Sequence, residues 1–288
     1  MIYQFLVCLA ALMSIIAPVE AGIMDMLSRA FSSEPLPKPP SIRILIVHDQ
    51  PSVFLEVKGK YHIYDPHTNT QFNTSFSGKR RTVEATFDGI RWGEEFPGIY
   101  QIAIAPDAPE TTTLVDGVEY RGIIYIYDVG GTISLVNQIP IEEFLSSVMP
   151  QRYPDPLPGN LLEAIAITSR TDSYNLAHSA NNPYWDVEAS KVGYHGYSPS
   201  RISKPLESAI QVTQDLILHR SDKGDWAVNP FAVSWKPAAA GKMDKGIVYS
   251  TLTIEEAAKL AKKGSTAVQI LEQAFPDTSI KKLEHAAS

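Results

Sequence analysis

Hydrophobic and polar residues alternate in short runs from about residue 41 to residue 136. The runs "VFLEV", "YHIYD" and "YQIAIA" are rich in β-branched and aromatic residues and are separated by Gly, Asp and Pro, a pattern that predicts β-strands. The run "IIYIYDVGGTISLVN" predicts a hairpin whose turn contains Gly130 and Gly131. This part of the chain is therefore expected to be rich in strands.

The spacing of hydrophobic residues changes after Ile139. The segments "IEEFLSSVM", "GNLLEAIAITSRTDSYNLAHSA", "KPLESAIQVTQ" and "TIEEAAKLAKKG" each place apolar residues at helical intervals, and Gly264 is a typical helix stop. The first segment is expected to end in a proline-broken turn within "SSVMPQRYPDP". Strands followed by helices predict an α+β fold, with a strand-rich part over residues 41–136, a helix-containing core over 137–280 and a tail over 281–288.

The N-terminal segment "FLVCLAALMSIIAPVEAG" is an apolar run that ends in Val19-Glu20-Ala21, a small-residue cleavage pattern. It predicts a secretory signal peptide over residues 1–21, followed by a proline-rich linker over 22–40. No Lys or Arg precedes the run, so an uncleaved membrane anchor is the alternative. The single cysteine lies inside the signal, and the mature chain would have no thiol for a disulfide, a zinc site or a nucleophile.

Composition narrows the function classes further. The 288 residues are 44% hydrophobic and 20% charged, as in an ordinary globular protein, and the formal charge is −7. Without a cluster of Lys and Arg, this charge gives no reason to expect nucleic acid as a partner. The histidines lack a metal-binding spacing, and no serine-hydrolase or phosphate-loop motif is present, so we expect no metal and no cofactor. A membrane contact is expected only through an uncleaved N-terminus.

Four segments carry a family likeness when they are taken in order. Tyr120-Arg121-Gly122 precedes "LVNQIPIEEFLSSVMP", and "LEAIAITSRTDSYNLA", "VGYHGY" and "AAKLAKKGSTAVQILEQAFPDTSI" follow. They resemble, in the same order, motifs of the SpoIID/LytB family of exported peptidoglycan proteins, and in the second of them Arg170 and Thr171 fall on matching letters. The likeness runs from about residue 42 to residue 280.

The resemblance implies a protein that acts on peptidoglycan in the periplasm or cell envelope, at sites of wall remodelling such as the division septum. Some members are lytic transglycosylases that cut glycan strands, and others enhance a partner amidase. In the first activity a lone carboxylic acid protonates the glycosidic oxygen and then accepts the proton of the sugar's C6 hydroxyl, so no water or enzyme nucleophile attacks. Such an acid needs a pKa that an apolar setting raises toward neutrality.

The chain departs from the family where this chemistry resides. Arg152 falls on the family's catalytic glutamate, and a guanidinium neither gives up nor accepts a proton at physiological pH. The family's "GHGvGMSQ" falls on residues 247–254 without its glycines or histidine, and Val192 stands in place of a glutamine. The resemblance therefore implies an inherited glycan groove whose proton carrier has been replaced.

Several side chains are candidates for a role in this groove. Asp155 is either a relocated acid or a turn residue between two prolines. Arg152 is either a clamp for the lactyl and stem-peptide carboxylates of peptidoglycan or a loop arginine without a task. Arg170 is expected to form a structural ion pair, and Glu142 and Glu143 to act as charges at a helix N-terminus. The further candidates for glycan contact are Gln151, Tyr153, Tyr194 and His195, with Tyr184, Trp185 and Tyr197 as aromatic residues that either stack on a sugar or pack against the core.

Two hypotheses of different classes follow. The first is a lytic transglycosylase-type protein that binds and cleaves glycan strands, with its catalysis in question because of Arg152. The second is a catalytically silent glycan-binding or scaffolding protein that recruits or enhances a cell-wall amidase. The side chain at position 152 favours the second hypothesis, whereas the retention of the whole scaffold favours the first.

Overall fold

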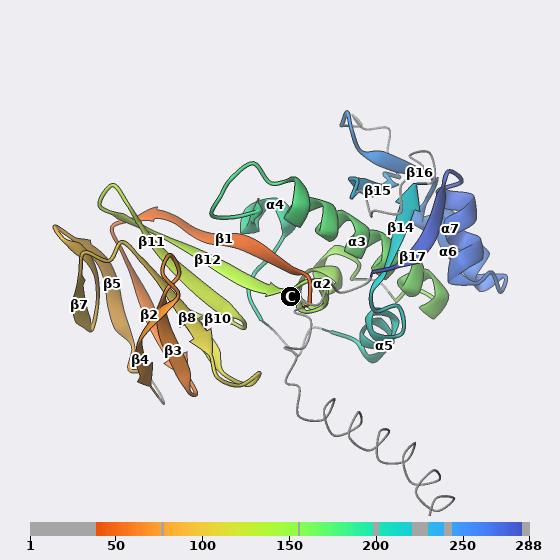
Figure 1. Ribbon diagram of the computed structural model, residues 1–288. Helices are drawn as coiled ribbons and strands as arrows, with labels where there is room; N and C mark the ends of the chain where they lie inside the picture. The colour runs from red at the N-terminus through yellow and green to blue at the C-terminus, as the bar shows by residue number, and fades with distance from the viewer. Residues whose placement is uncertain are drawn as a thin grey trace, which may run out of the picture. The chain divides into compact units, whose positions relative to one another are not determined.

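Strands make up the first part of the described chain, and its helices all lie in the second part (Figure 1). The computed structural model describes residues 39–75, 78–154, 156–197, 202–220, 230–238 and 244–283, which all belong to one unit, Pro39–Glu284. The predicted signal peptide, most of the predicted linker, Cys8 and Asp155 lie outside the described residues. The predicted α+β class is confirmed.

A seven-stranded sheet joins the start of the described chain to the strands that lead into the helices. Its order is β13-β1-β12-β11-β8-β3-β4, and β1 pairs antiparallel with β12 along nearly its whole length (Figure 1). The predicted hairpin is confirmed as β11 and β12, joined by Gly130 and Gly131 with φ of 64° and 89°. The strands are β1 (Ser41–Gln50), β3 (Tyr61–Asp65), β4 (Thr70–Ser75), β8 (Gln101–Pro106), β11 (Ile123–Val129), β12 (Thr132–Pro140) and β13 (Val187–Glu188).

A six-stranded sheet, in the order β10-β9-β2-β5-β6-β7, shares a core with the first sheet. In β2, buried Val53 and Leu55 alternate with exposed or partly exposed neighbours, and in β11 buried Ile124 and Ile126 alternate with partly exposed ones. One apolar face of each sheet is therefore buried, as the alternating sequence pattern predicts. The strands are β2 (Ser52–Lys58), β5 (Arg81–Thr86), β6 (Gly89–Trp92), β7 (Glu94–Pro97), β9 (Thr112–Val115) and β10 (Val118–Tyr120).

The helical part is organised around α3, which contacts α2, α5, α6, α7 and the strands β14 and β15. Its residues are buried almost continuously from Leu161 to Ser173. Within the described range, no helix is long and apolar enough to cross a membrane. The helices are α2 (Ile141–Arg152), α3 (Gly159–Ser179), α4 (Ala189–Val192), α5 (Lys204–Val212), α6 (Ile254–Lys262) and α7 (Ala267–Ala274). Two short sheets pair β14 (Leu216–Arg220) with β17 (Thr278–Lys282) and β15 (Val233–Lys236) with β16 (Val248–Thr253).

The end of α2 differs from the expected proline-broken turn. The helix continues through Pro150 to Arg152. Proline has no N–H to donate, but Tyr153 N still donates to Met149 O at 2.9 Å, so the last turn remains closed. Arg152 is therefore a helical residue at a C-terminus, where the helix dipole favours a positive charge.

Helices α6 and α7 begin with capping boxes. Thr253 accepts a hydrogen bond from the Glu256 amide and its own amide donates to the Glu256 carboxylate, and Thr266 and Gln269 repeat this arrangement. The predicted stop of α6 is confirmed, because the helix ends at Lys262 and Gly264 has a φ of 95°.

Candidate functional site: a pocket at the end of helix α2

A pocket of about 390 Å³ opens beside the last turn of α2. Four elements that are far apart in the sequence contribute to it, namely the end of α2, the second half of α3, the strand β15 and the start of α6. Its main lining residues are Arg152, Tyr153, Asp172, Val233, Trp235 and Lys236. A cavity of this size is in the range of small-molecule and sugar sites.

Asp172 is held in the pocket by the contact between α3 and β15. One turn earlier on the same helical face, Thr168 Oγ1 accepts a hydrogen bond from the Trp235 indole Nε1 at 2.9 Å. Val233 N donates to Asp172 Oδ1 at 3.4 Å. This is the one donor to the Asp172 carboxylate among the described residues, so the carboxylate retains acceptor capacity for a ligand.

Burial shifts the pKa of Asp172 in the direction that favours a general acid. The pKa of the Asp172 carboxyl is raised above its usual value because burial penalises the charged form. The Val233 amide and the charge of Arg152 act in the opposite direction. Burial also raises the pKa of Glu143, against the charge of Arg121, but Glu143 does not line this pocket. Asp172 is therefore the carboxyl of the pocket that can retain a proton at a higher pH than an ordinary aspartate.

Arg152 and Lys236 place two exposed cations on the pocket. Burial raises the pKa of Tyr153, and the nearby Arg152 side chain opposes that rise, as it does at Asp172. A guanidinium cannot transfer a proton, but it binds carboxylates well. The pocket thus combines a carboxyl that can move a proton with two cations that can hold an anion. No group of three or more potential metal-ligating side chains occurs in the described part of the chain.

Arg170 has the structural role that the sequence predicted. Its side chain is 1% exposed, and its Nε and Nη2 donate to Glu142 Oε1 and Oε2 at 2.6 and 2.8 Å. Its guanidinium also donates to Leu216 O at 3.1 Å and to Ile210 O at 3.2 Å. Glu142, expected only as a charge at a helix N-terminus, is therefore also the partner of a buried ion pair. The pair joins α3 to α2, α5 and β14, and so fixes the two helices that carry Asp172 and Arg152.

The five residues predicted to bind glycan do not all meet in this pocket. Arg152 and Tyr153 line it, whereas Gln151, Tyr194 and His195 do not. The Tyr194 side chain is 3% exposed, and its hydroxyl donates to Asn137 Oδ1 at 2.6 Å. This burial corrects the expectation that Tyr194 contacts a sugar, because the ring packs in the core. His195 is exposed, away from the pocket lining.

The other predicted aromatic residues, Tyr184, Trp185 and Tyr197, do not line the Arg152 pocket either. Tyr197 lies under Arg121, whose Cζ is 3.8 Å from the centre of the ring, in a cation–π contact. Tyr184 is 46% exposed and lines a different pocket, on the seven-stranded sheet, with Trp185 beside it.

Sequence reasoning missed Asp172. The search for a relocated acid stayed close to position 152 along the chain, whereas the packing of α3 brings in a carboxyl from 20 residues further on (172 minus 152). A signal was present, because "AIAITSRTDSYN" places an acid two residues after a buried arginine in a mostly apolar helix. A carboxyl in such a helix requires a partner or a task.

Comparison with known proteins identifies part of the chain. Residues 129–219 match the family model described as SpoIID, stage II sporulation protein, and this range contains Arg152, Arg170 and Asp172. An uncharacterized protein of Chlamydia pneumoniae is 29% identical over 248 residues, which cover 85% of this chain and 82% of the relative. An uncharacterized protein of Chlamydia muridarum is 27% identical over 273 residues, which cover 93% and 85%. An uncharacterized protein of Brachyspira hyodysenteriae is 23% identical over 175 residues, which cover 60% and 46%. No solved structure matches the chain.

Proposed function

We propose that this chain, which belongs to the SpoIID family of sporulation and cell-wall proteins, binds the glycan strands of peptidoglycan in the Arg152 pocket and cleaves them with Asp172 as the acid–base group. The resemblance of its motifs supports peptidoglycan as the substrate, and its N-terminal sequence supports export to the cell envelope. The division septum, where strands are remodelled, is the expected site of action.

The observation that carries this proposal is a carboxyl with a raised pKa in the pocket where Arg152 replaces the acid that the family resemblance implies. Asp172 reaches the pocket from α3, while Arg152 occupies the end of α2. Partial burial beside Val233 and Trp235 keeps the Asp172 carboxyl protonated to a higher pH than in water. This is the apolar setting that a lone catalytic acid requires.

The reaction that suits a single carboxyl is intramolecular. The Asp172 carboxyl donates its proton to the glycosidic oxygen as the bond from C1 to that oxygen breaks. The resulting carboxylate then accepts the proton of the C6 hydroxyl of the same sugar, whose oxygen bonds to C1 and closes a 1,6-anhydro ring. The carboxyl ends protonated, no water is consumed, and one residue performs both proton transfers.

Arg152 and Lys236 supply binding rather than proton transfer. Muramic acid residues carry lactyl carboxylates, either free or extended into stem peptides that end in carboxylates. A guanidinium at the pocket entrance can hold such a group with two parallel hydrogen bonds, and the ammonium of Lys236 adds a second positive charge. The two cations therefore favour strands that retain an acidic group near the scissile linkage.

A second function is favoured by the charge at position 152. An exposed, permanently cationic side chain stands where the family resemblance implies an acid. If Asp172 serves only to hold the Val233 amide, the pocket binds glycan without cutting it. The chain would then act as a scaffold that recruits or enhances a cell-wall amidase.

The test is to incubate the purified protein with glycan strands that carry stem peptides and with strands that lack them, and to measure 1,6-anhydromuramic ends by mass spectrometry. Strand binding is measured in parallel by co-sedimentation. Asp172→Asn preserves the shape and the oxygen that accepts from Val233 N, but it removes the proton carrier. We expect it to lower the cleavage rate by roughly 10²–10⁴-fold, the usual worth of general acid–base catalysis, while the strands remain bound.

Glu255→Gln is the matched control, because Glu255 is an exposed carboxyl that lines the same pocket. It should leave the cleavage rate close to that of the wild type, and Arg152→Ala should weaken the binding of acidic strands. Cleavage that is unaffected by Asp172→Asn would show that the acid lies elsewhere. Wild-type protein that binds strands without producing anhydro ends would support the scaffold function instead.

A further inference from the structure

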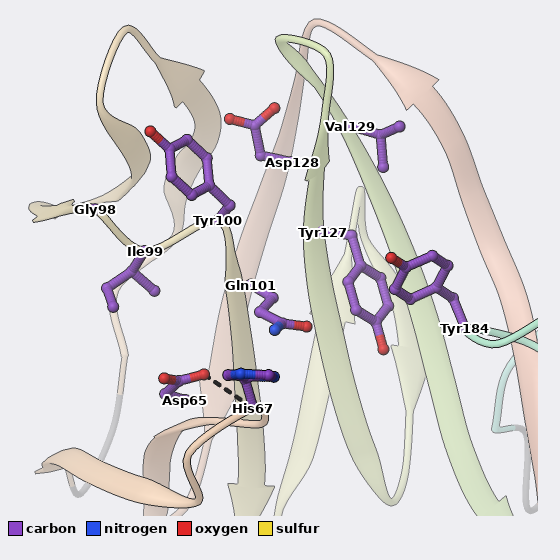
Figure 2. A pocket seen from close by; sticks show the side chains of 10 residues that line it. All are labelled: Asp65, His67, Gly98, Ile99, Tyr100, Gln101, Tyr127, Asp128, Val129 and Tyr184. Carbon is purple, nitrogen blue, oxygen red and sulfur yellow. Dashed lines mark hydrogen bonds between the residues drawn. The ribbon is translucent and has the colours of Figure 1, made fainter.

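A second pocket, of about 280 Å³, lies on the seven-stranded sheet and shares no lining residue with the Arg152 pocket. Figure 2 shows side chains from several strands and from the loop before β13 around it. Its principal lining residues are His67, Tyr100, Gln101, Tyr127, Asp128 and Tyr184. Aromatic rings and uncharged or acidic polar groups therefore line this pocket, whereas cations line the other.

Two of the three tyrosine rings that line the pocket are exposed, and the third, Tyr127, is half-buried beside them. Tyr100 and Tyr184 are 49% and 46% exposed. The Tyr184 ring meets the Tyr127 ring edge to face with centroids 4.9 Å apart (Figure 2). The Tyr125 ring, which does not line the pocket, lies parallel to the Tyr127 ring, with centroids 6.2 Å apart and an interplanar angle of 7°. Single exposed aromatic residues are common, but a contiguous set at a concave site indicates binding.

The loop that carries Tyr184 is anchored to β1. Arg43 Nε and Nη2 donate to Asp186 Oδ1 at 3.2 and 2.7 Å, and Arg43 N donates to Asp186 Oδ2 at 2.7 Å. Arg43 Nη1 donates to Pro183 O at 2.5 Å, and Asn182 Oδ1 accepts from the amide of Tyr184 at 2.8 Å. The Asp186 side chain is 3% exposed, so this ion pair is shielded from solvent on one side. An exposed ring on a loop fixed in this way is already in its binding position, which lowers the entropic cost of binding.

Polar groups of the pocket remain available to a ligand. None of the hydrogen bonds between described residues uses the side chain of Gln101 or the hydroxyls of Tyr127 and Tyr184. Asp128 Oδ1 accepts from Gly131 N at 2.9 Å, which leaves its second oxygen as a further acceptor. Burial raises the pKa of Tyr127 to about 12, so its hydroxyl remains a neutral donor.

We propose that this pocket is a second binding site of the protein, specific for a neutral pyranose saccharide whose rings stack on Tyr184 and Tyr127 and whose hydroxyl or acetamido groups bond to Gln101 and Asp128. The apolar face of a pyranose ring matches an exposed aromatic face, and the ring hydroxyls match the free amide and carboxylate. The Asp128 carboxylate disfavours anionic sugars. The inference does not require the Arg152 pocket to be catalytic, and it rests on the proposed function only for the expectation that the saccharide is part of a glycan strand.

The probe is N,N′,N″,N‴-tetraacetylchitotetraose, a neutral chain of N-acetylglucosamine that contains neither muramic acid nor peptide. Binding to the full chain is measured by isothermal titration calorimetry and by ligand-observed NMR. Tyr184→Ala removes an exposed ring and should weaken binding about tenfold, the effect of losing one stacking contact of about 1.4 kcal/mol. Tyr184→Phe keeps the ring and should keep most of the affinity.

Phe87→Ala is the matched control, because Phe87 is fully exposed and lines neither pocket. It should bind the tetrasaccharide as the wild type does, and so should Asp172→Asn and Arg152→Ala, because these two change only the other pocket. The inference would be overturned if the wild type did not bind the tetrasaccharide, or if Tyr184→Ala bound it with full affinity. It would also be overturned if Phe87→Ala lost as much affinity as Tyr184→Ala. Loss of binding in Arg152→Ala but not in Tyr184→Ala would assign the saccharide to the Arg152 pocket and refute the second site. Unaltered cleavage by Asp172→Asn would refute the proposed function alone.

Discussion

Removal of one partner from the ion pair between Arg170 and Glu142 should strongly destabilise the helical part, because it leaves the other charge, which is at least partly buried, without its counter-ion. Arg170→Met keeps an unbranched chain about as long as the aliphatic part of arginine and removes the guanidinium. The carbonyl oxygens of Leu216 and Ile210 then lose a donor, and Glu142 loses its counter-ion. Each unsatisfied buried group costs about 1–3 kcal/mol, but the Glu142 side chain is 28% exposed and recovers some hydration. We therefore expect the free energy of unfolding to fall by about 3–5 kcal/mol.

The measurement is urea unfolding followed by circular dichroism, for the wild type, Arg170→Met, Glu142→Met and the double variant. Each single substitution leaves one charge without its partner, whereas the double variant leaves neither, so its loss should be clearly smaller than the sum of the two. Thermal unfolding gives a second measurement. A loss of about 1 kcal/mol lowers the melting temperature of a unit of this size by roughly 2–4 °C, so Arg170→Met should melt about 6–20 °C below the wild type.

Arg91 offers a matched control on the protein surface. It donates to Glu84 at 2.7 Å, but its side chain is 47% exposed, so Arg91→Met should change stability by no more than about 1 kcal/mol. If Arg170→Met unfolds within about 1 kcal/mol of the wild type, or if the losses in the double variant simply add, the reasoning about the buried pair is refuted.

Three further changes test other parts of the structure. Tyr194→Phe leaves the buried Asn137 oxygen without its donor and should cost about 1–3 kcal/mol in urea unfolding. Thr253→Ala removes one capping box and should cost about 1 kcal/mol, which calorimetry detects as a lower melting temperature. Burial raises the pKa of Asp172 in the folded state, so the unfolded chain releases this proton at a lower pH. The stability due to this group therefore falls as the pH rises from the ordinary aspartate pKa through the raised value. Asp172→Asn should therefore gain stability relative to the wild type across that window, measured as melting temperature against pH, and a constant difference between the two proteins would contradict the shift.

The fold class followed from sequence because its signals are local. The hairpin at Gly130 and Gly131 depends on two residues that accept positive φ, and the stop of α6 depends on Gly264. The structural role of Arg170 was also predictable, because a buried guanidinium without a partner is too costly to retain. These conclusions need only the chemistry of short segments.

The composition of the pocket was not predictable in the same way. Helix α2 continues through Pro150 although proline has no N–H to donate. Its last turn is closed instead by the hydrogen bond from Tyr153 N to Met149 O. The approach of Asp172 depends on the packing of α3 against β15, a contact between residues 61 positions apart (233 minus 172) that no periodicity encodes. The acid of the pocket, Asp172, is therefore close to Arg152 in space but not along the chain.

Aromatic residues show the same limit. Tyr194 was predicted to bind glycan, and Tyr184 was predicted either to stack on a sugar or to pack against the core. The structure places Tyr184 exposed on an anchored loop and buries Tyr194 with its hydroxyl bonded to Asn137. Register decides such cases, since Tyr127 projects from one face of β11 while Ile126 enters the core from the other. The sequence alternation predicts that the faces differ, but only the sheet order identifies which neighbours each face meets.

The charges of the two pockets differ in a way that matches an alternating polymer. In the two sites that we propose, Arg152 and Lys236 bind an acidic sugar, whereas Asp128 and the tyrosines beside it bind a neutral one. Peptidoglycan strands alternate between these two kinds of sugar, so a chain with both pockets could select such strands over a uniformly neutral polymer. Arg152 would then serve two purposes, since the same positive charge that holds an acidic sugar also opposes the effect of burial on Asp172. A cation at position 152 is thus compatible with acid catalysis from α3, because it opposes but does not cancel the rise that burial causes in the pKa of Asp172.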